Sequence, residues 1–159
     1  MQREAEGDGI KVLPGAVELI ALLAEAGVPA VIVSGSSRAE IESLLPRLDP
    51  GQSLLFHLGA EDYERGKPAP DGYLKATKRL GVEPSRCLVL EDSEAGIESA
   101  RRAGIRVWAT RAANAPEGTH GHQRQGSAER IVDGIAGWTL ESLRRDWVHY
   151  AAQSSKEES

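Results

Sequence analysis

Cysteine, aromatic residues and long hydrophobic runs are scarce in this sequence, and each shortage excludes a class of protein. Cys87 is the single cysteine among 159 residues, so the chain can form neither an internal disulfide nor a multi-cysteine zinc site. Its hydrophobic runs are a handful of residues long, far below the roughly 20 that span a bilayer. The N-terminal residues also lack the apolar segment of a signal peptide. We therefore expect a cytoplasmic protein that does not contact a membrane.

An excess of positive charge is missing as well. The chain carries 19 lysine and arginine residues against 24 aspartate and glutamate residues, a formal net charge of −5, and so has no basic footprint for nucleic acid. Hydrophobic residues make up 40% of the chain and charged residues 27%, which is ordinary for a soluble globular protein. The length fits one domain.

Short β-rich apolar runs alternate with segments of helical spacing over residues 14–110. Apolar residues recur at helical spacing over residues 16–26 and 71–80, each followed by a glycine, and more weakly around Ile41 and Ile97. This alternation is typical of βαβ units, so we predict an α/β fold whose parallel sheet is covered by helices on both faces. The apolar runs lie at residues 30–33, 54–58, 87–90 and 105–108.

The C-terminal part has a different composition. Residues 112–127 are rich in Gly, Ala, Gln and His and are predicted to form an exposed loop, whereas residues 130–132 have the pattern of one last short strand. Thr139 is a candidate N-cap for a helix that runs through Val148. We expect residues 151–159 to form a disordered tail.

Polar and charged residues follow three of the predicted strands. Ser34, Gly35 and Ser36 come after the first strand, and Glu91-Asp92 comes after the third. The loop after the second strand contains Lys67. Because ligands of open parallel sheets bind beyond the carboxyl ends of the strands, we expect these residues to share one rim.

The chemistry of this set favours a phosphate ligand and a magnesium ion. The Ser34 hydroxyl and the backbone N–H groups of Gly35 and Ser36 can surround a phosphate, to which Lys67 adds a positive charge. Glu91 and Asp92 offer hard oxygen ligands, which suit Mg²⁺ better than zinc. Phosphoryl transfer needs mainly positioning and charge neutralisation, which these groups supply.

Each of these features also has a structural explanation when it is taken singly. A Ser-Gly-Ser-Ser sequence after a strand is commonly only a turn, and a single lysine in a loop is commonly a solvated charge. Glu91 and Asp92 precede a helix, where acidic residues complement the helix dipole. It is the combination, in this order and at strand ends, that points to a site.

Two longer motifs surround the candidate residues. They are Gly66-Lys67-Pro68-Ala69-Pro70-Asp71 and Cys87-Leu88-Val89-Leu90-Glu91-Asp92-Ser93-Glu94-Ala95-Gly96-Ile97. Both motifs resemble the haloacid dehalogenase (HAD) superfamily, and in particular its β-phosphoglucomutase and phosphatase branch. The chain distances, 33 residues from Ser34 to Lys67 and 25 from Lys67 to Asp92, are typical of that branch. The similarity covers about residues 12–143.

The resemblance implies a Rossmann-like core with three α/β/α layers and Mg²⁺-dependent phosphoryl transfer through an aspartyl phosphate. By position, Ser34 would bind the transferring phosphoryl group with the N–H of Gly35, and Lys67 would bridge the phosphate and the nucleophile. Asp92, with Glu91, would hold Mg²⁺. The implied substrate of such a phosphatase or phosphomutase is a small phosphorylated metabolite, for example a sugar phosphate.

The chain departs from the family at the nucleophile. The family carries a DxD motif after an apolar strand, followed by a helical cap, and neither is found here; Asp8-Gly9 matches only the last letters of that motif. On this interpretation residues 1–11 are a remnant of the junction between cap and core, and residues 12–150 are the core without its central strand. The strands that end at Ser34 and Glu91 then either leave a gap or pair directly.

Two functions follow from this departure. In the first, the chain belongs to a HAD-like phosphatase, is inactive alone and works with a complementing N-terminal fragment. In the second, it is a non-catalytic truncated HAD remnant that binds phosphate or a partner protein. Because an unpaired strand edge is a template for pairing, self-association is a further expectation.

Overall fold

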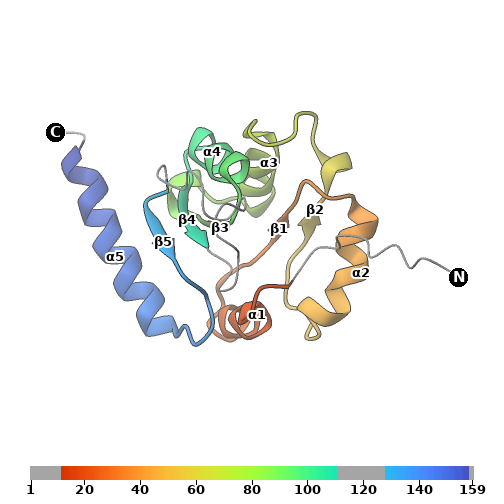
Figure 1. The fold of residues 1–159 in the computed structure, drawn as a ribbon, viewed down its shortest axis with the longest axis horizontal. Coiled ribbons are helices and arrows are strands. Elements are labelled where there is room, and N and C mark those ends of the chain that lie inside the picture. Colours follow the sequence, from red (N-terminus) through yellow and green to blue (C-terminus); the bar gives the residue numbers. More distant parts are fainter. Residues whose placement is uncertain (1–11, 111–127, 158–159) are drawn as a thin grey trace, which may run out of the picture.

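The structure, a computed structural model, describes residues 12–110 and 128–157. Its helices are α1 (Ala16–Glu25), α2 (Arg38–Leu48), α3 (Asp71–Leu80), α4 (Glu94–Arg102) and α5 (Leu140–Glu157). Its strands are β1 (Ile32–Val33), β2 (His57–Leu58), β3 (Leu88–Glu91), β4 (Arg106–Thr110) and β5 (Arg130–Val132). Short 3₁₀ turns, Ala60–Asp62 and Pro84–Arg86, precede α3 and β3. The predicted alternation of strands and helices is confirmed (Figure 1).

The strands form two separate parallel sheets. In the first, β1 pairs with β2 and Ile32 lies opposite His57. In the second, β3, β4 and β5 pair in that order, with Leu90 opposite Trp108. The α/β class with parallel strands is therefore confirmed, and the described strands form two sheets instead of one.

The division lies between β1 and β3, a boundary that we call the seam. Val33 of β1 packs against the core cluster that contains Val89 of β3, so the two sheets are neighbours (Figure 1). The N–H of Ser34 donates to Leu58 O at 3.0 Å, so the backbone N–H and C=O of Ser34 face β2. Because these groups alternate along a strand, the backbone N–H and C=O of Val33 face the opposite edge, toward β3. The Val33 carbonyl accepts from the side chain of Lys67 instead of from a strand. Of the two arrangements expected at this point, the described residues adopt the gap.

The main core lies on the β3–β4 side of the seam. Tyr73 from α3, Ile97 and Ala100 from α4, and Val89 and Val107 from the sheet are buried together there. Glycine ends both α3 and the turn after α4: Gly81 and Gly104 have φ values of +67° and +74°. The rim at the carboxyl ends of β3 and β4 is thus held by a close-packed layer.

The C-terminal helix is longer than expected. α5 continues to Glu157, past residue 150, because residues 140–157 contain neither glycine nor proline to end it. Residues 1–11, which include Asp8, and the loop predicted at residues 112–127 lie outside the described residues. Among the helices that are described, none combines the length and the hydropathy needed to cross a bilayer.

Candidate active site

Lys67 lies at the centre of the predicted site and crosses the seam. Its ammonium group donates to Val33 O at 3.1 Å, at the end of β1, and forms an ion pair with Glu91 Oε1, at the end of β3. The two side chains are 16% and 8% exposed, so water screens this ion pair little. One lysine therefore ties together the carboxyl ends of the two sheets.

The Glu91 carboxylate has donors on both of its oxygens. Besides Lys67, the Tyr73 hydroxyl donates to Oε1 at 2.6 Å, and Ser93 Oγ donates to Oε2 at 3.3 Å. Gly96 leaves the space for this arrangement, since a Cβ there would stand 2.1 Å from the carboxylate carbon. A buried carboxylate needs such donors, because an unpaired charge is costly away from water.

Local structure explains why these groups meet. β3 ends at Glu91, and Ser93 then caps α4 by accepting from the N–H of Gly96 at 3.0 Å. The loop that carries Lys67 is fastened from α4, where the fully buried Ser99 donates to Ala69 O at 2.7 Å. The Ser99–Ala69 hydrogen bond therefore positions the loop so that Lys67 lies at the end of β3, independently of the ion pair.

The predicted phosphate loop follows β1 directly. The N–H of Ser36 donates to Ser34 Oγ at 3.1 Å, and Tyr63 donates through its hydroxyl to Ser34 O at 2.6 Å. Ser37 and Glu40 form a capping box that starts α2. Gly35 is exposed and has nothing within 4 Å of the position of a Cβ, so a ligand can approach the backbone there.

Two tyrosines hold the rim as hydrogen-bond donors. Burial, and then the nearby Glu91 carboxylate, raises the pKa of Tyr73 far above its ordinary value. Burial, and then the charge of Asp62, raises the pKa of Tyr63. Both phenols therefore stay protonated over the whole working pH range, as their donor roles require.

Comparison with known proteins decides the family. Residues 2–104 match the family described as haloacid dehalogenase-like hydrolase. The chain belongs to the HAD-like hydrolases. Its relatives place it in family IA, among the CbbY and β-phosphoglucomutase-like phosphatases.

Three relatives illustrate this HAD membership. The bifunctional riboflavin kinase/FMN phosphatase of Arabidopsis thaliana is 36% identical over 149 residues, which cover 91% of this chain and 38% of that protein. Hexitol phosphatase A of Escherichia coli is 40% identical over 120 residues, which cover 72% of this chain and 51% of that protein. CbbY from Rhodobacter sphaeroides, solved in complex with phosphate, has a TM-score of 0.72 at 28% identity and covers 83% of this chain and 58% of that one.

This HAD chain spans between about two fifths and one half of the length of the curated relatives that it matches most strongly. The structure brings Lys67 into contact with Glu91 and, through Val33, next to the loop of Ser34. Asp92 directly follows β3 and is exposed at the rim. No cluster of three or more His, Cys, Asp or Glu side chains suited to a metal occurs within residues 12–110 and 128–149.

Sequence reasoning missed Tyr63 and Tyr73. Tyr73 has the helical spacing of a core residue, and this spacing hides its hydroxyl. A signal was nevertheless present, because a tyrosine in a buried helix face needs a hydrogen-bond partner, and Glu91 was a candidate.

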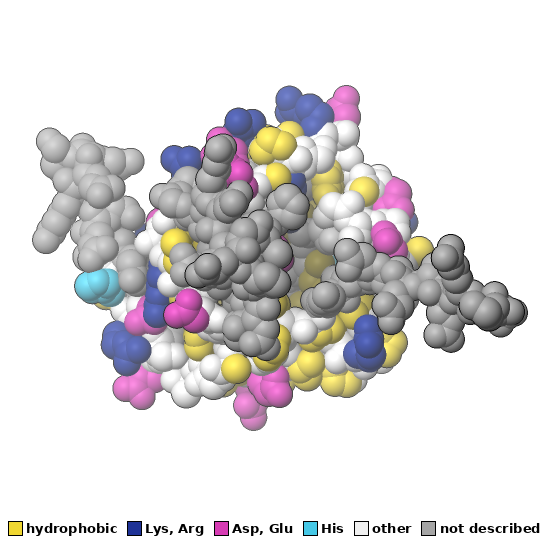
Figure 2. All heavy atoms as spheres, viewed as in Figure 1, with side chains coloured by type: hydrophobic (Ala, Val, Ile, Leu, Met, Phe, Trp, Pro, Cys, Tyr) yellow, Lys and Arg dark blue, Asp and Glu magenta, His cyan; other side chains and the backbone are white. Residues whose placement is uncertain are grey.

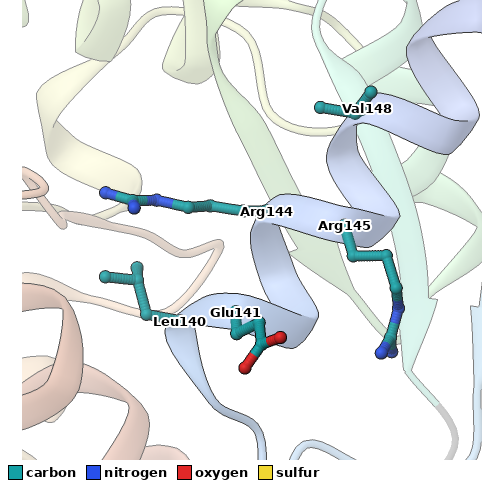
Figure 3. A pocket seen from close by; sticks show the side chains of 5 residues that line it. All are labelled: Leu140, Glu141, Arg144, Arg145 and Val148. Carbon is teal, nitrogen blue, oxygen red and sulfur yellow. The ribbon is translucent and has the colours of Figure 1, made fainter.

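A shallow pocket lies away from this site, on α5. Its lining comes from that helix alone, as Figure 3 illustrates, and includes none of the predicted site residues. The lining residues are Leu140, Glu141, Arg144, Arg145 and Val148.

Proposed function

We propose that this chain is the phosphate-handling part of a Mg²⁺-dependent phosphatase, or phosphomutase, that acts on a small phosphorylated metabolite such as a sugar phosphate. The observation that carries the proposal is Lys67, whose ammonium stands between the Ser34 loop and the Glu91 carboxylate. The names of the relatives give further support: hexitol phosphatase A, and CbbY from R. sphaeroides, which has been solved with phosphate and with xylulose-(1,5)bisphosphate.

In this proposal the phosphoryl group is held by Ser34 and by the N–H groups of Gly35 and Ser36. Lys67 lies beside them and neutralises charge on the phosphoryl oxygens. Because the lysine is held on two sides before any ligand arrives, its charge needs little reorganisation as the reaction proceeds. Positioning and charge neutralisation are the main requirements of phosphoryl transfer.

The acids at the end of β3 fit Mg²⁺ by their chemistry. Magnesium is usually bound by one or two carboxylates together with substrate phosphate and water, so Asp92 and Glu91 make a sufficient protein contribution. Asp92 is exposed at the rim, whereas Glu91 is also held by Lys67 and Tyr73. We assign the direct ligand role to Asp92, with Glu91 beside it. Bound there, Mg²⁺ would neutralise charge on the phosphate.

The attacking group of the proposed route is an aspartate, and no two aspartates of this chain are spaced as in DxD. We propose that a complementing N-terminal fragment supplies it. The backbone edge of β1 that faces the seam supports this proposal, since a parallel strand could pair there. On this view the chain alone does not hydrolyse phosphomonoesters.

The test is titration of the chain with inorganic phosphate, with and without Mg²⁺, by calorimetry. Lys67→Met should weaken phosphate binding at least about tenfold, because a charge-assisted hydrogen bond is lost. Lys75→Met is the matched control: Lys75 is exposed on α3, and its ammonium donates to the Asp62 carbonyl and not to a residue of the predicted site. Asp92→Asn should reduce the effect of Mg²⁺. Equal phosphate affinities of the two lysine variants would overturn the site.

The second candidate function is a non-catalytic HAD remnant that binds phosphate or a partner protein. The observation in its favour is the half-buried state of β1, a strand that parallel sheets normally bury. Hydrolysis of p-nitrophenyl phosphate separates the two candidates. If the chain becomes active when mixed with an N-terminal fragment that carries a strand and DxD, the result supports the phosphatase function. If the chain binds phosphate but never becomes active, the result supports the non-catalytic remnant.

A further inference from the structure

Tyr73 touches both members of the central ion pair. Its hydroxyl donates to Glu91 Oε1 at 2.6 Å, the oxygen that also accepts from Lys67. The Lys67 ammonium lies 5.0 Å from the centroid of the Tyr73 ring, within the range of a cation–π contact. Tyr73 itself is only 6% exposed, on the first turn of α3. One side chain therefore contacts the lysine with its ring and the glutamate with its hydroxyl.

The hydrogen bonds of the Lys67 ammonium show what these two contacts with Tyr73 could achieve. A lysine ammonium has three N–H groups. Among the described residues, Val33 O accepts from one and Glu91 Oε1 from a second. The third N–H has no acceptor among the residues that the structure describes, and the Tyr73 ring covers a further side of the ammonium. The direction of that N–H depends on where the Glu91 oxygen is held.

We propose that Tyr73 is a positioning residue: by fixing Glu91 with its hydroxyl and Lys67 with its ring, it aims the remaining N–H of Lys67 at the phosphate loop. The identity of the group that Lys67 binds, a phosphate, rests on the proposed function. The position of Lys67 does not, because its contacts with Val33, Glu91 and Tyr73 fix it. It assigns a role to a residue that sequence analysis places only in the core.

The hydroxyl is the informative atom. A phenylalanine would keep the ring and fill the same space, so packing alone does not require tyrosine here. Without the phenol, Glu91 Oε1 would keep Lys67 as its one donor among the described residues, and the carboxylate could rotate. Tyr63 is a natural comparison, because its hydroxyl makes a bond of the same length, 2.6 Å, but donates it to the Ser34 carbonyl and not to Glu91.

The experiment observes the Lys67 ammonium directly by NMR, in the full chain labelled with ¹⁵N at the lysine side chains. The sequence has only five lysines, and Lys67→Met identifies the signal of interest. In the unmodified chain we expect a Lys67 ammonium signal that exchanges slowly with water and shows a nuclear Overhauser contact to the Tyr73 ring. This contact needs no variant, and its absence would overturn the proposal.

Tyr73→Phe should shift the Lys67 signal and speed its hydrogen exchange by about tenfold or more, the effect of losing one hydrogen bond to a charged group. Tyr63→Phe, which deletes the same atom elsewhere on the rim, should leave the signal unchanged. A merely structural role of Tyr73 predicts a change in melting temperature with no change in the Lys67 signal, and that result would refute the proposal. Backbone amide spectra of both variants verify the fold.

A phosphate titration separates this inference from the proposed function. If both hold, Tyr73→Phe binds inorganic phosphate roughly tenfold more weakly than the unmodified chain. If no form of the protein binds phosphate, the proposed function fails, whereas the position of Lys67 is still decided by its NMR signal. If phosphate binds equally well to the Tyr73→Phe variant and the Lys67 signal is unchanged, the positioning role is refuted and the proposed function stands.

Discussion

The two sides of the seam differ in how completely they are packed. On one side, which we call the β3 half (α3, α4, β3, β4, β5 and α5), Ile97, Ala100 and Trp108 are fully buried. On the other, the β1 half (α1, α2, β1 and β2), Ile41 and Leu58 are buried too, but residues 31–33 are only half-buried and Leu55 is 60% exposed. Figure 2 shows hydrophobic side chains at the surface over the α1 and α2 part of the molecule. A strand of a parallel sheet becomes buried only when it has neighbours on both edges and helices on both faces, and among the described residues β1 is paired along one edge.

The halves are joined by specific contacts as well as by the packing of Val33 against the core of the β3 half. Lys67 is one of them. Another is Gly15, at the start of α1, whose φ of +89° and close approach to Ala136 leave no room for a side chain: a Cβ would stand 2.5 Å from Ala136 Cα. The contact joins α1 to the turn before α5. Two contacts therefore join the halves: Lys67 connects Val33 and Glu91 at the rim, and Gly15 packs against the backbone of Ala136 near α1.

The largest effect is expected from the core of the β3 half. Ile97→Ala removes a fully buried side chain between α4 and the sheet, so the free energy of unfolding should fall by about 4 kcal/mol. Ile32→Ala deletes the same atoms from half-buried β1 and should cost less than half as much. Urea denaturation of both variants measures the difference. Equal costs would mean that the two halves are packed alike.

Breaking the bridge at the rim should come next. Lys67→Met leaves the Glu91 charge buried without its cation, which should destabilise the chain by about 3 kcal/mol in urea denaturation. The double variant Lys67→Met/Glu91→Gln removes both charges, keeps an oxygen to accept from Tyr73, and should recover most of that loss. If the double variant is less stable than Lys67→Met, the ion pair is not the origin of the effect.

Sequence patterns located most elements and part of the site. Periodicity placed α1 and α3 within a residue or so, because glycine ends the predicted helices at residues 27 and 81. The rule that ligand-binding groups gather at strand ends predicts that Lys67 and Glu91 share one rim, and the structure brings the two side chains into contact there. The division of the sheet could not be decided, because pairing depends on whether a neighbouring strand is present and not on β1 itself. Tyr73 was missed because helical spacing reports its ring and not its hydroxyl.

Hydrogen exchange should detect the seam without any substitution. Amides of β1 have one paired edge and a half-buried environment, so they should open with a free energy about 2 kcal/mol below that of β3 and β4 amides. Native-state exchange followed by NMR gives both values. Addition of an N-terminal fragment that pairs with β1 should close the difference, whereas equal protection in the chain alone would show that the halves open as one unit.

The smallest effect concerns how α5 is fastened to the β3 half. Arg130 of β5 forms an ion pair with Asp146 of α5, and the hydrogen bond from Arg130 lowers the pKa of Asp146 below its ordinary value although burial opposes the shift. A carboxylate with a lowered pKa stabilises the fold above its unfolded value, about 3.9, and loses that contribution as the pH falls through the folded value. Asp146→Asn should therefore cost up to about 1 kcal/mol at pH 7, a small figure because the pair is partly solvated.

The pH dependence distinguishes this ion pair from a packing effect. The cost of Asp146→Asn, measured as the difference in urea unfolding free energy from the unmodified chain, should shrink below about pH 4 as Asp146 becomes protonated in both states. Glu129 acts in the opposite sense, because burial raises its pKa in spite of Arg106, but it is present in both proteins and cancels in the difference. Asp62, whose pKa is lowered chiefly by Arg38, cancels in the same way. A cost that stays constant from pH 7 to pH 3 would mean that Asp146 holds α5 by its shape and not by its charge.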